Sequence, residues 1–166
     1  GVVKITSAVV LRRCLIDHNG IGSTSVGIYC NGSGAKIIDC EVEDSVAFDG
    51  VNIGSGGSNA LVQNCKVASN GVGIYLSSGA DSVLIQKCEI VAGGSNYGIT
   101  LSSGLTGTVI RSSIVRKSGS AAECVHATGA LSAKIYQCCF NLDSGAIDTD
   151  ITNLIGTPYN VSDADL

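Results

Sequence analysis

Bulky side chains are scarce in this chain of 166 residues. Aromatic residues make up 4% of it, tryptophan is absent and proline occurs once, whereas glycine occurs 22 times. The hydrophobic residue types nevertheless account for 45% of the chain. This composition argues against a large globular core built around aromatic rings. It favours a narrow core of Val, Ile, Leu, Ala and Cys.

A strong charge imbalance and long apolar runs are also missing. The net charge is −4, and lysine and arginine are scattered rather than gathered in a basic stripe, so we expect no nucleic-acid partner. No apolar run approaches the ~18 residues of a membrane-spanning helix. No segment keeps a helical period either. Apolar and polar residues alternate in short stretches, which is the pattern of β-strands.

Two short phrases recur along the chain. The first, apolar-x-x-Cys-x-apolar, appears at residues 11–16 (LRRCLI) and returns at steps of 23 to 26 residues. Its central position is occupied by Cys14, Cys40, Cys65, Cys88, Ser113 and Cys138. The second phrase, Gly-apolar-x-apolar, begins at Gly27, Gly50, Gly73 and Gly98. A repeat this short cannot bury its own hydrophobic face, so the copies must stack as a solenoid.

The direction of the phrases fixes how the strands pair. Because the same phrase returns in the same direction in each copy, equivalent strands must lie parallel. The spacing within the first phrase breaks strict alternation and predicts a corner in every coil. The residues expected to stack at that corner are Arg13, Asp39, Asn64, Lys87, Ser112 and Gln137.

Coils of this length with these two phrases resemble the right-handed parallel β-helix of the pectin-lyase-like superfamily. The resemblance covers roughly residues 3 to 150 and implies an all-β fold, a single right-handed parallel β-helix of about six coils. We therefore predict a β-helix over residues 1–150 and a C-terminal tail over 151–166 that caps the last coil. The hydrolase signatures of the superfamily (Asn-Thr-Asp, Gly-Asp-Asp, Gly-His-Gly) are absent from the chain.

The cysteines of the first phrase are predicted to form one inward column. Neighbouring Cα atoms would lie about 4.8 Å apart, within reach of a disulfide by distance alone. Parallel side chains and Ser113 in the same column favour a ladder of free thiols in the core. No Cys-x-x-Cys pair occurs, so zinc is not expected. Cys139 should point outward. A ladder of free thiols indicates folding in a reducing cytoplasm.

One outward column carries residue types that suit sugar binding. Tyr29 and Tyr75 lie two coils apart, about 9.6 Å, which is near the length of a disaccharide. We predict a carbohydrate-binding face made by Tyr29, Asn52, Tyr75, Thr100 and His126, with Tyr97 at its edge and Asp148 continuing the column. The alternative is that tyrosine and threonine are simply good strand formers on an exposed face.

A second candidate site is acidic. Asp17 and Glu43 occupy one outward position in adjacent coils, and Asp44 occupies the next position with His18. Stacked carboxylates raise each other's pKa, can act as an acid/base pair and could attract calcium. Lyases and hydrolases of the resembled superfamily place carboxylates on such a surface. The alternative is a solvated turn whose acids, Glu41 and Asp49 included, are neutralised by nearby arginines.

The preferred functional prediction is a non-catalytic β-helix segment of a larger virion or cell-surface protein that presents a flat face to a polysaccharide. We expect no cofactor and no dedicated metal site. A polysaccharide lyase or glycoside hydrolase fragment using Asp17, Glu43 and Asp44 is the first alternative, and a structural spacer or adhesin rod is the second. The uncapped N-terminal end predicts a neighbouring domain or a homotrimer.

Overall fold

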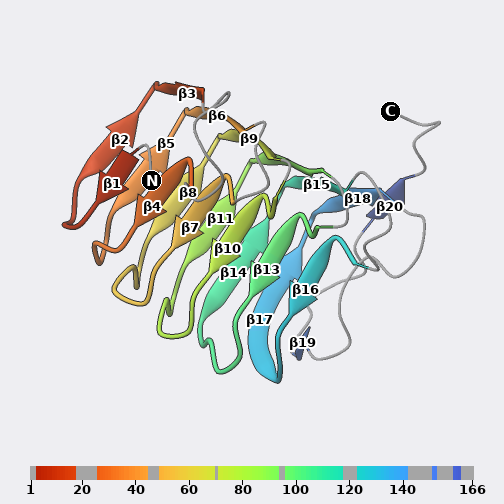
Figure 1. Cartoon of the computed structure of the whole chain (residues 1–166). Helices are drawn as coiled ribbons and strands as arrows, with labels where there is room; N and C mark the ends of the chain where they lie inside the picture. Colours follow the sequence, from red (N-terminus) through yellow and green to blue (C-terminus); the bar gives the residue numbers. More distant parts are fainter. Residues whose placement is uncertain are drawn as a thin grey trace.

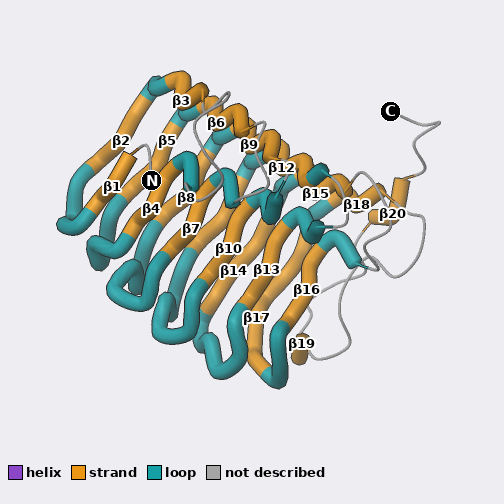
Figure 2. Tube along the Cα trace, in the orientation of Figure 1, coloured by secondary structure: helices purple, strands orange, loops and turns teal. Residues whose placement is uncertain are grey.

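The computed structural model describes residues 3–17, 26–44, 49–69, 71–93, 96–117, 123–141, 151–152 and 159–161. All regular secondary structure in these ranges is β-strand, arranged as successive coils of short strands (Figures 1 and 2). Each of the first six coils contributes one strand to each of three sheets, and each strand pairs in parallel with its equivalent in every neighbouring coil that has one. The predicted all-β parallel β-helix is confirmed.

We call the three sheets wall A, wall B and wall C. Wall A contains, in order, β1 (Val3–Ile5), β4 (Ile28–Cys30), β7 (Val51–Ile53), β10 (Ile74–Leu76), β13 (Ile99–Leu101) and β16 (Val125–Ala127). Wall B contains β2 (Val10–Arg12), β5 (Lys36–Ile38), β8 (Leu61–Gln63), β11 (Leu84–Gln86), β14 (Thr108–Arg111), β17 (Leu131–Tyr136) and β19 (Ile151–Thr152). Wall C contains β3 (Leu15–Asp17), β6 (Glu41–Asp44), β9 (Lys66–Ser69), β12 (Glu89–Ala92), β15 (Ile114–Lys117), β18 (Cys139–Asn141) and β20 (Tyr159–Val161).

The core consists of like residues stacked from coil to coil. On wall A, Ile74 pairs with Val51 on one side and with Ile99 on the other, and all three are fully buried. A side chain in this position contacts an equivalent apolar side chain above and below it, so burial is nearly complete although the core is narrow. The β-branched residues of the repeat suit this arrangement because they pack well on a pleated surface.

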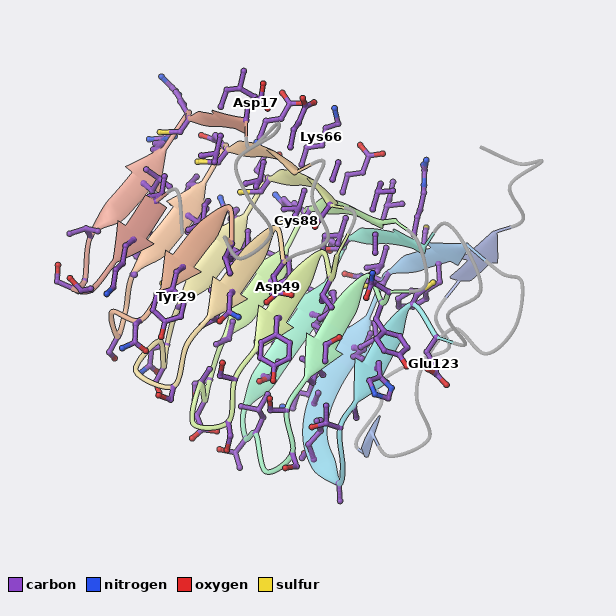
Figure 3. The ribbon with its side chains drawn as sticks, viewed as in Figure 1. Asp17, Tyr29, Asp49, Lys66, Cys88 and Glu123 are labelled. Carbon is purple, nitrogen blue, oxygen red and sulfur yellow. The ribbon has the colours of Figure 1, made fainter. Side chains whose placement is uncertain are left out.

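The structure confirms that the predicted cysteine column lies in the interior. Cys40, Cys65 and Cys88 are 2–3% exposed, and Figure 3 shows Cys88 between the walls. All eight cysteines are free thiols. The Cys88 thiol donates to the carbonyl of Gln86 at 3.2 Å and Ser113 Oγ donates to the carbonyl of Arg111 at 2.9 Å, which explains why serine can take this position. Cys139 lies in the outward column of Glu89, as predicted.

The predicted corner lies between walls B and C and uses the left-handed backbone region. Each of its six residues has a φ between 50° and 55°. One residue in this conformation turns the chain sharply, and its N–H still reaches the next coil, as when Asp39 N donates to Gln63 O at 3.0 Å. The backbone ladder is therefore continuous through the bend.

The glycine that opens the second phrase is required by packing. A Cβ on Gly73 would lie 2.5 Å from both the carbonyl oxygen of Gly98 and the Cγ2 of Ile90. The carbonyl oxygen of Gly98 accepts the N–H of Ile74 at 2.9 Å, so its close approach to Gly73 is part of the parallel ladder of hydrogen bonds. Glycine at this position lets β4, β7, β10 and β13 begin directly against the side chains of wall C.

Two short strands of the C-terminal tail pair in parallel with the preceding coil, β19 with β17 and β20 with β18. They extend the ladders of walls B and C by one further strand each. Most of the tail, residues 153–158 and 162–166, lies outside the described residues, so the cap over 151–166 stays a prediction.

Candidate functional site

The outward column of wall A has the register that the sequence predicts. Tyr29 pairs with Asn52, Asn52 with Tyr75, Tyr75 with Thr100, and Thr100 with His126. Lys4 of β1 precedes Tyr29 in the same column. Asp148, predicted to continue it, lies outside the described residues. The column runs along the stack, across the strands, so each coil presents one of these side chains on the same face (Figure 3).

Hydrogen bonds hold the middle of this column. Asn52 Nδ2 donates to Asp49 Oδ2 at 2.8 Å, and the hydroxyls of Tyr75 and Ser102 lie 3.0 Å apart. Ser102 is buried and follows β13, in the next coil. These hydrogen bonds join the column to residues just outside its strands, and they fix the orientation of the Asn52 amide and the Tyr75 ring. A site with fixed side chains loses less entropy when it binds a ligand.

Two acceptors on this face are buried without a hydrogen-bond partner among the described residues, Asn52 Oδ1 and Thr100 Oγ1. Thr100 points outward from wall A and yet is only 4% exposed, because it lies between larger neighbours in the column. An unsatisfied buried polar atom is unfavourable by about 1–3 kcal/mol. Both atoms therefore gain from a ligand hydroxyl or a water molecule that reaches them.

An aromatic pair closes the C-terminal end of the column. The rings of Tyr97 and His126 are stacked, with centroids 4.0 Å apart and an interplanar angle of 13°. Glu123 Oε2 lies 3.6 Å from His126 Nδ1, three residues earlier in the same coil. Tyr97 thus lies against the last residue of the column, and its part in a carbohydrate-binding face stays a prediction. The half-buried pair offers a flat platform next to a carboxylate, a combination that suits sugar rings and their hydroxyls.

The acidic candidates lie on a different wall. Asp17 pairs with Glu43 in register on wall C, as the sequence predicts. Lys66 Nζ lies 2.6 Å from Glu41 Oε1 and 3.7 Å from Glu43 Oε1, so a lysine neutralises this part of the cluster. Figure 3 shows Asp17 and Lys66 at the edge of the stack, away from Tyr29 and Glu123. Neither His18 nor the side chain of Asp44 is among the described parts.

Ion pairing also controls the protonation of these surface groups. The hydrogen bond from Lys66 lowers the pKa of Glu41, and Glu41 in turn raises the pKa of Lys66. At the corner, the pKa of Asp39 is lowered by hydrogen bonds from Asn64 and Arg12. Each shift favours the charged form of its group. These contacts stabilise ordinary surface ion pairs, whereas a general acid needs a carboxyl whose pKa is raised.

The structure adds two carboxylates to wall A that the sequence analysis did not assign there. Asp49, grouped above with the acids near Glu41, instead binds Asn52 on wall A, which corrects that grouping. Glu123 faces His126. Asp49 directly precedes Gly50, the first residue of the second phrase, and Glu123 directly precedes Cys124, which takes the place of that glycine. Tyr97 has the same position in its own coil, directly before Gly98. This shared position before a wall A strand is the sequence signal that could have assigned Asp49 and Glu123 to wall A. Asp49 and Glu123 lie three coils apart, about 14 Å, too far to form a catalytic pair.

Wall A therefore provides hydroxyl, amide and carboxylate groups at one-coil intervals, together with aromatic rings. In the parts of the chain that the structure describes, no group of three His, Cys, Asp or Glu side chains could hold a metal ion. No helix long and apolar enough to cross a membrane occurs in those parts either. The arrangement is suited to binding a hydroxyl-rich ligand along the stack.

Comparison with known proteins agrees with this architecture. A family model described as the right handed beta helix region matches residues 2–150. No curated protein and no solved structure matches the chain at a significant level. The family match supplies the hand of the coil, so the predicted right-handed parallel β-helix is confirmed. Because the match covers most of the chain and the strands stack in three parallel sheets, this chain belongs to the right-handed β-helix family.

Proposed function

We propose that wall A is a non-catalytic binding face for a polysaccharide. The observation that carries the proposal is the in-register column from Tyr29 to His126, in which aromatic, amide and hydroxyl groups alternate at one-coil spacing. Tyr29 and Tyr75 stand two coils apart, about 9.6 Å, so the two rings can pack against every second sugar of a chain that runs along the stack. Sugars combine apolar C–H faces with hydroxyls, and this column offers partners for both.

A lyase or hydrolase built on Asp17, Glu43 and Asp44 is less well supported. Glu43 is paired with Lys66, and the tyrosines lie on another wall. An enzyme needs the groups that hold the sugar and the groups that cleave it to converge on one bond. Binding without cleavage therefore fits the geometry better.

We further infer that the chain is a segment of a larger virion or cell-surface protein, within the pectin-lyase-like superfamily, and that it folds in a reducing cytoplasm. The eight free cysteines, five of them in the interior column, support the reducing compartment. In the first coil, Val9, Val10 and Leu15 are 46%, 58% and 67% exposed. Val10 and Leu15 stand in the outward columns of walls B and C, so these apolar side chains support a neighbouring domain or a second copy beside the first coil.

Binding to a glycan array tests the proposal. The protein and a Tyr29→Ala/Tyr75→Ala variant would be compared with a Tyr136→Ala control, since Tyr136 is a half-buried tyrosine on wall B. Loss of two stacking rings should weaken binding by at least about tenfold, and the control should bind like the parent protein. Unchanged binding in the double variant would remove these tyrosines from the site. A parent protein that binds no glycan would favour the structural spacer.

A further inference from the structure

The charged residues of this β-helix are distributed unequally among its three walls. The wall A strands β4, β7, β10, β13 and β16 contain no Lys, Arg, Asp or Glu. Wall B carries Arg12, Lys36, Arg111 and Lys134 and no acid in its strands from β2 to β17. Wall C carries both signs, for example Glu41 beside Lys66. The proposed binding face is thus the uncharged wall.

The charges nearest to that face are mostly negative. Asp49 and Glu123 lie along its edge, in contact with Asn52 and His126 respectively. Lys4 is the one described basic side chain in the column, and it stands at the N-terminal end beyond Tyr29. A carboxylate accepts hydrogen bonds and donates none, so Asp49 and Glu123 can each receive ligand hydroxyls. A carboxylated sugar at the same place would be repelled, and from Asn52 to His126 the described side chains of the column offer it no guanidinium or ammonium group.

The spacing defines the shape of the ligand. From Tyr29 to His126 the column advances four coils, about 19 Å, or about the length of four linked sugars. The unpartnered oxygens of Asn52 and Thr100 fall within this span, and the Tyr97–His126 stack ends it. A ligand that uses all of these groups must be extended and must run along the stack, across the strands.

We propose, building on the polysaccharide-binding function above, that wall A selects an extended and uncharged polysaccharide and rejects polyuronates. Hydroxyl groups of the ligand donate to Asp49 and Glu123 at the edge of the face. Its apolar sugar faces pack against Tyr29, Tyr75 and the Tyr97–His126 stack. About four sugar units fill the face.

Two matched series of oligosaccharides test this selection. Neutral β-linked gluco-oligosaccharides and oligogalacturonates of two to six units would be titrated against the protein by calorimetry, after a screen of neutral polysaccharides on the array. We expect at least a tenfold preference for a neutral ligand, with affinity rising up to about four units and then levelling. An Asp49→Asn/Glu123→Gln variant should bind oligogalacturonate at least threefold better than the parent protein. A Glu89→Gln control on wall C should change neither affinity.

The outcomes separate this inference from the function on which it rests. Tyrosine-dependent binding of oligogalacturonate with equal or higher affinity than any neutral ligand would overturn the selection and leave polysaccharide binding intact. Affinity that does not change beyond two units would overturn the extended mode along the stack. If the parent protein binds neither series and no array glycan, polysaccharide binding itself fails, and the selection falls with it.

Discussion

Replacing Gly73 by alanine should destabilise the β-helix more than the same replacement at Gly104. The new Cβ at position 73 would lie 2.5 Å from the Gly98 carbonyl oxygen and 2.5 Å from Ile90 Cγ2. The oxygen is held by its hydrogen bond from Ile74, and Ile90 is fully buried. Neither neighbour is the free end of a flexible side chain, so relief requires movement of the coil itself.

The two substitutions cost stability for different physical reasons. Overpacking a core that must shift costs about 1–3 kcal/mol, and two rigid neighbours at position 73 place that variant near the upper value. Gly104 has a φ of 76° and nothing within 4 Å of an added Cβ. Its alanine variant bears only the strain of the left-handed region, about 1 kcal/mol. We therefore expect a difference of about 1–2 kcal/mol in the free energy of unfolding.

Urea unfolding followed by far-ultraviolet circular dichroism measures this difference. The slopes of the two variants should agree if each unfolds as a unit, which is the condition for comparing midpoints. Gly73 lies two residues before Tyr75, so the Gly73→Ala variant should also bind glycan less well, whereas Gly104→Ala should not. A Gly73→Ala variant at least as stable as Gly104→Ala would refute the idea that close packing selects glycine before β4, β7, β10 and β13.

Three further predictions concern the corner, the surface ion pairs and the thiols. Lys87→Gly should stabilise the fold by about 0.5 kcal/mol in urea unfolding, because the φ of Lys87 is 54°; a loss of stability would contradict the strain argument. The lowered pKa of Asp39 stabilises the fold at pH values above its unfolded pKa, and that stabilisation disappears as the pH falls through the folded pKa. Asp39→Asn should therefore melt below the parent protein at about pH 6 and approach it at about pH 3, and a constant gap would exclude the linkage. Ellman's reagent should label Cys14 and Cys139 rapidly in the native state and the six buried thiols only on unfolding; rapid labelling of Cys40 would show that its burial is wrong.

The interior of this protein could be predicted from its sequence because each coil repeats the same spatial requirement. The spacing from Leu11 to Cys14 placed the corner at Arg13, and the backbone there is left-handed as the geometry demands. Ser113 in the cysteine column favoured free thiols over disulfides, and all eight cysteines are free. The register of the strands determines which side chains face the core, since a shift of one residue would turn the apolar side chains outward.

The walls could be predicted only in part, because outward side chains have no fixed partner until the coils are in place. The sequence placed Asp17 and Glu43 together correctly, yet it did not show that Lys66 reaches across from the next coil to Glu43. Asp49 precedes its strand in a connection whose length differs between coils, so counting residues did not assign it to wall A. The Tyr97–His126 stack likewise depends on the path of a connection and not on strand register.

The three walls differ in how far their polar side chains already satisfy one another. On wall B, Gln86 donates to Gln63 at 2.6 Å, and Arg111 donates twice to Gln86. On wall C, Lys66 binds Glu41. Such ladders leave few groups for a ligand, because binding would first have to break bonds that the fold has made.

Wall A follows the same register, but the hydrogen bonds of Asn52 and Tyr75 run to residues of the connections, Asp49 and Ser102, and not from strand to strand. Asn52 and Thr100 each keep a buried oxygen without a partner in the described structure, between rings that are already held in place. A stack whose strands are equivalent can therefore still have one binding wall, provided that its outward side chains on that wall do not satisfy one another.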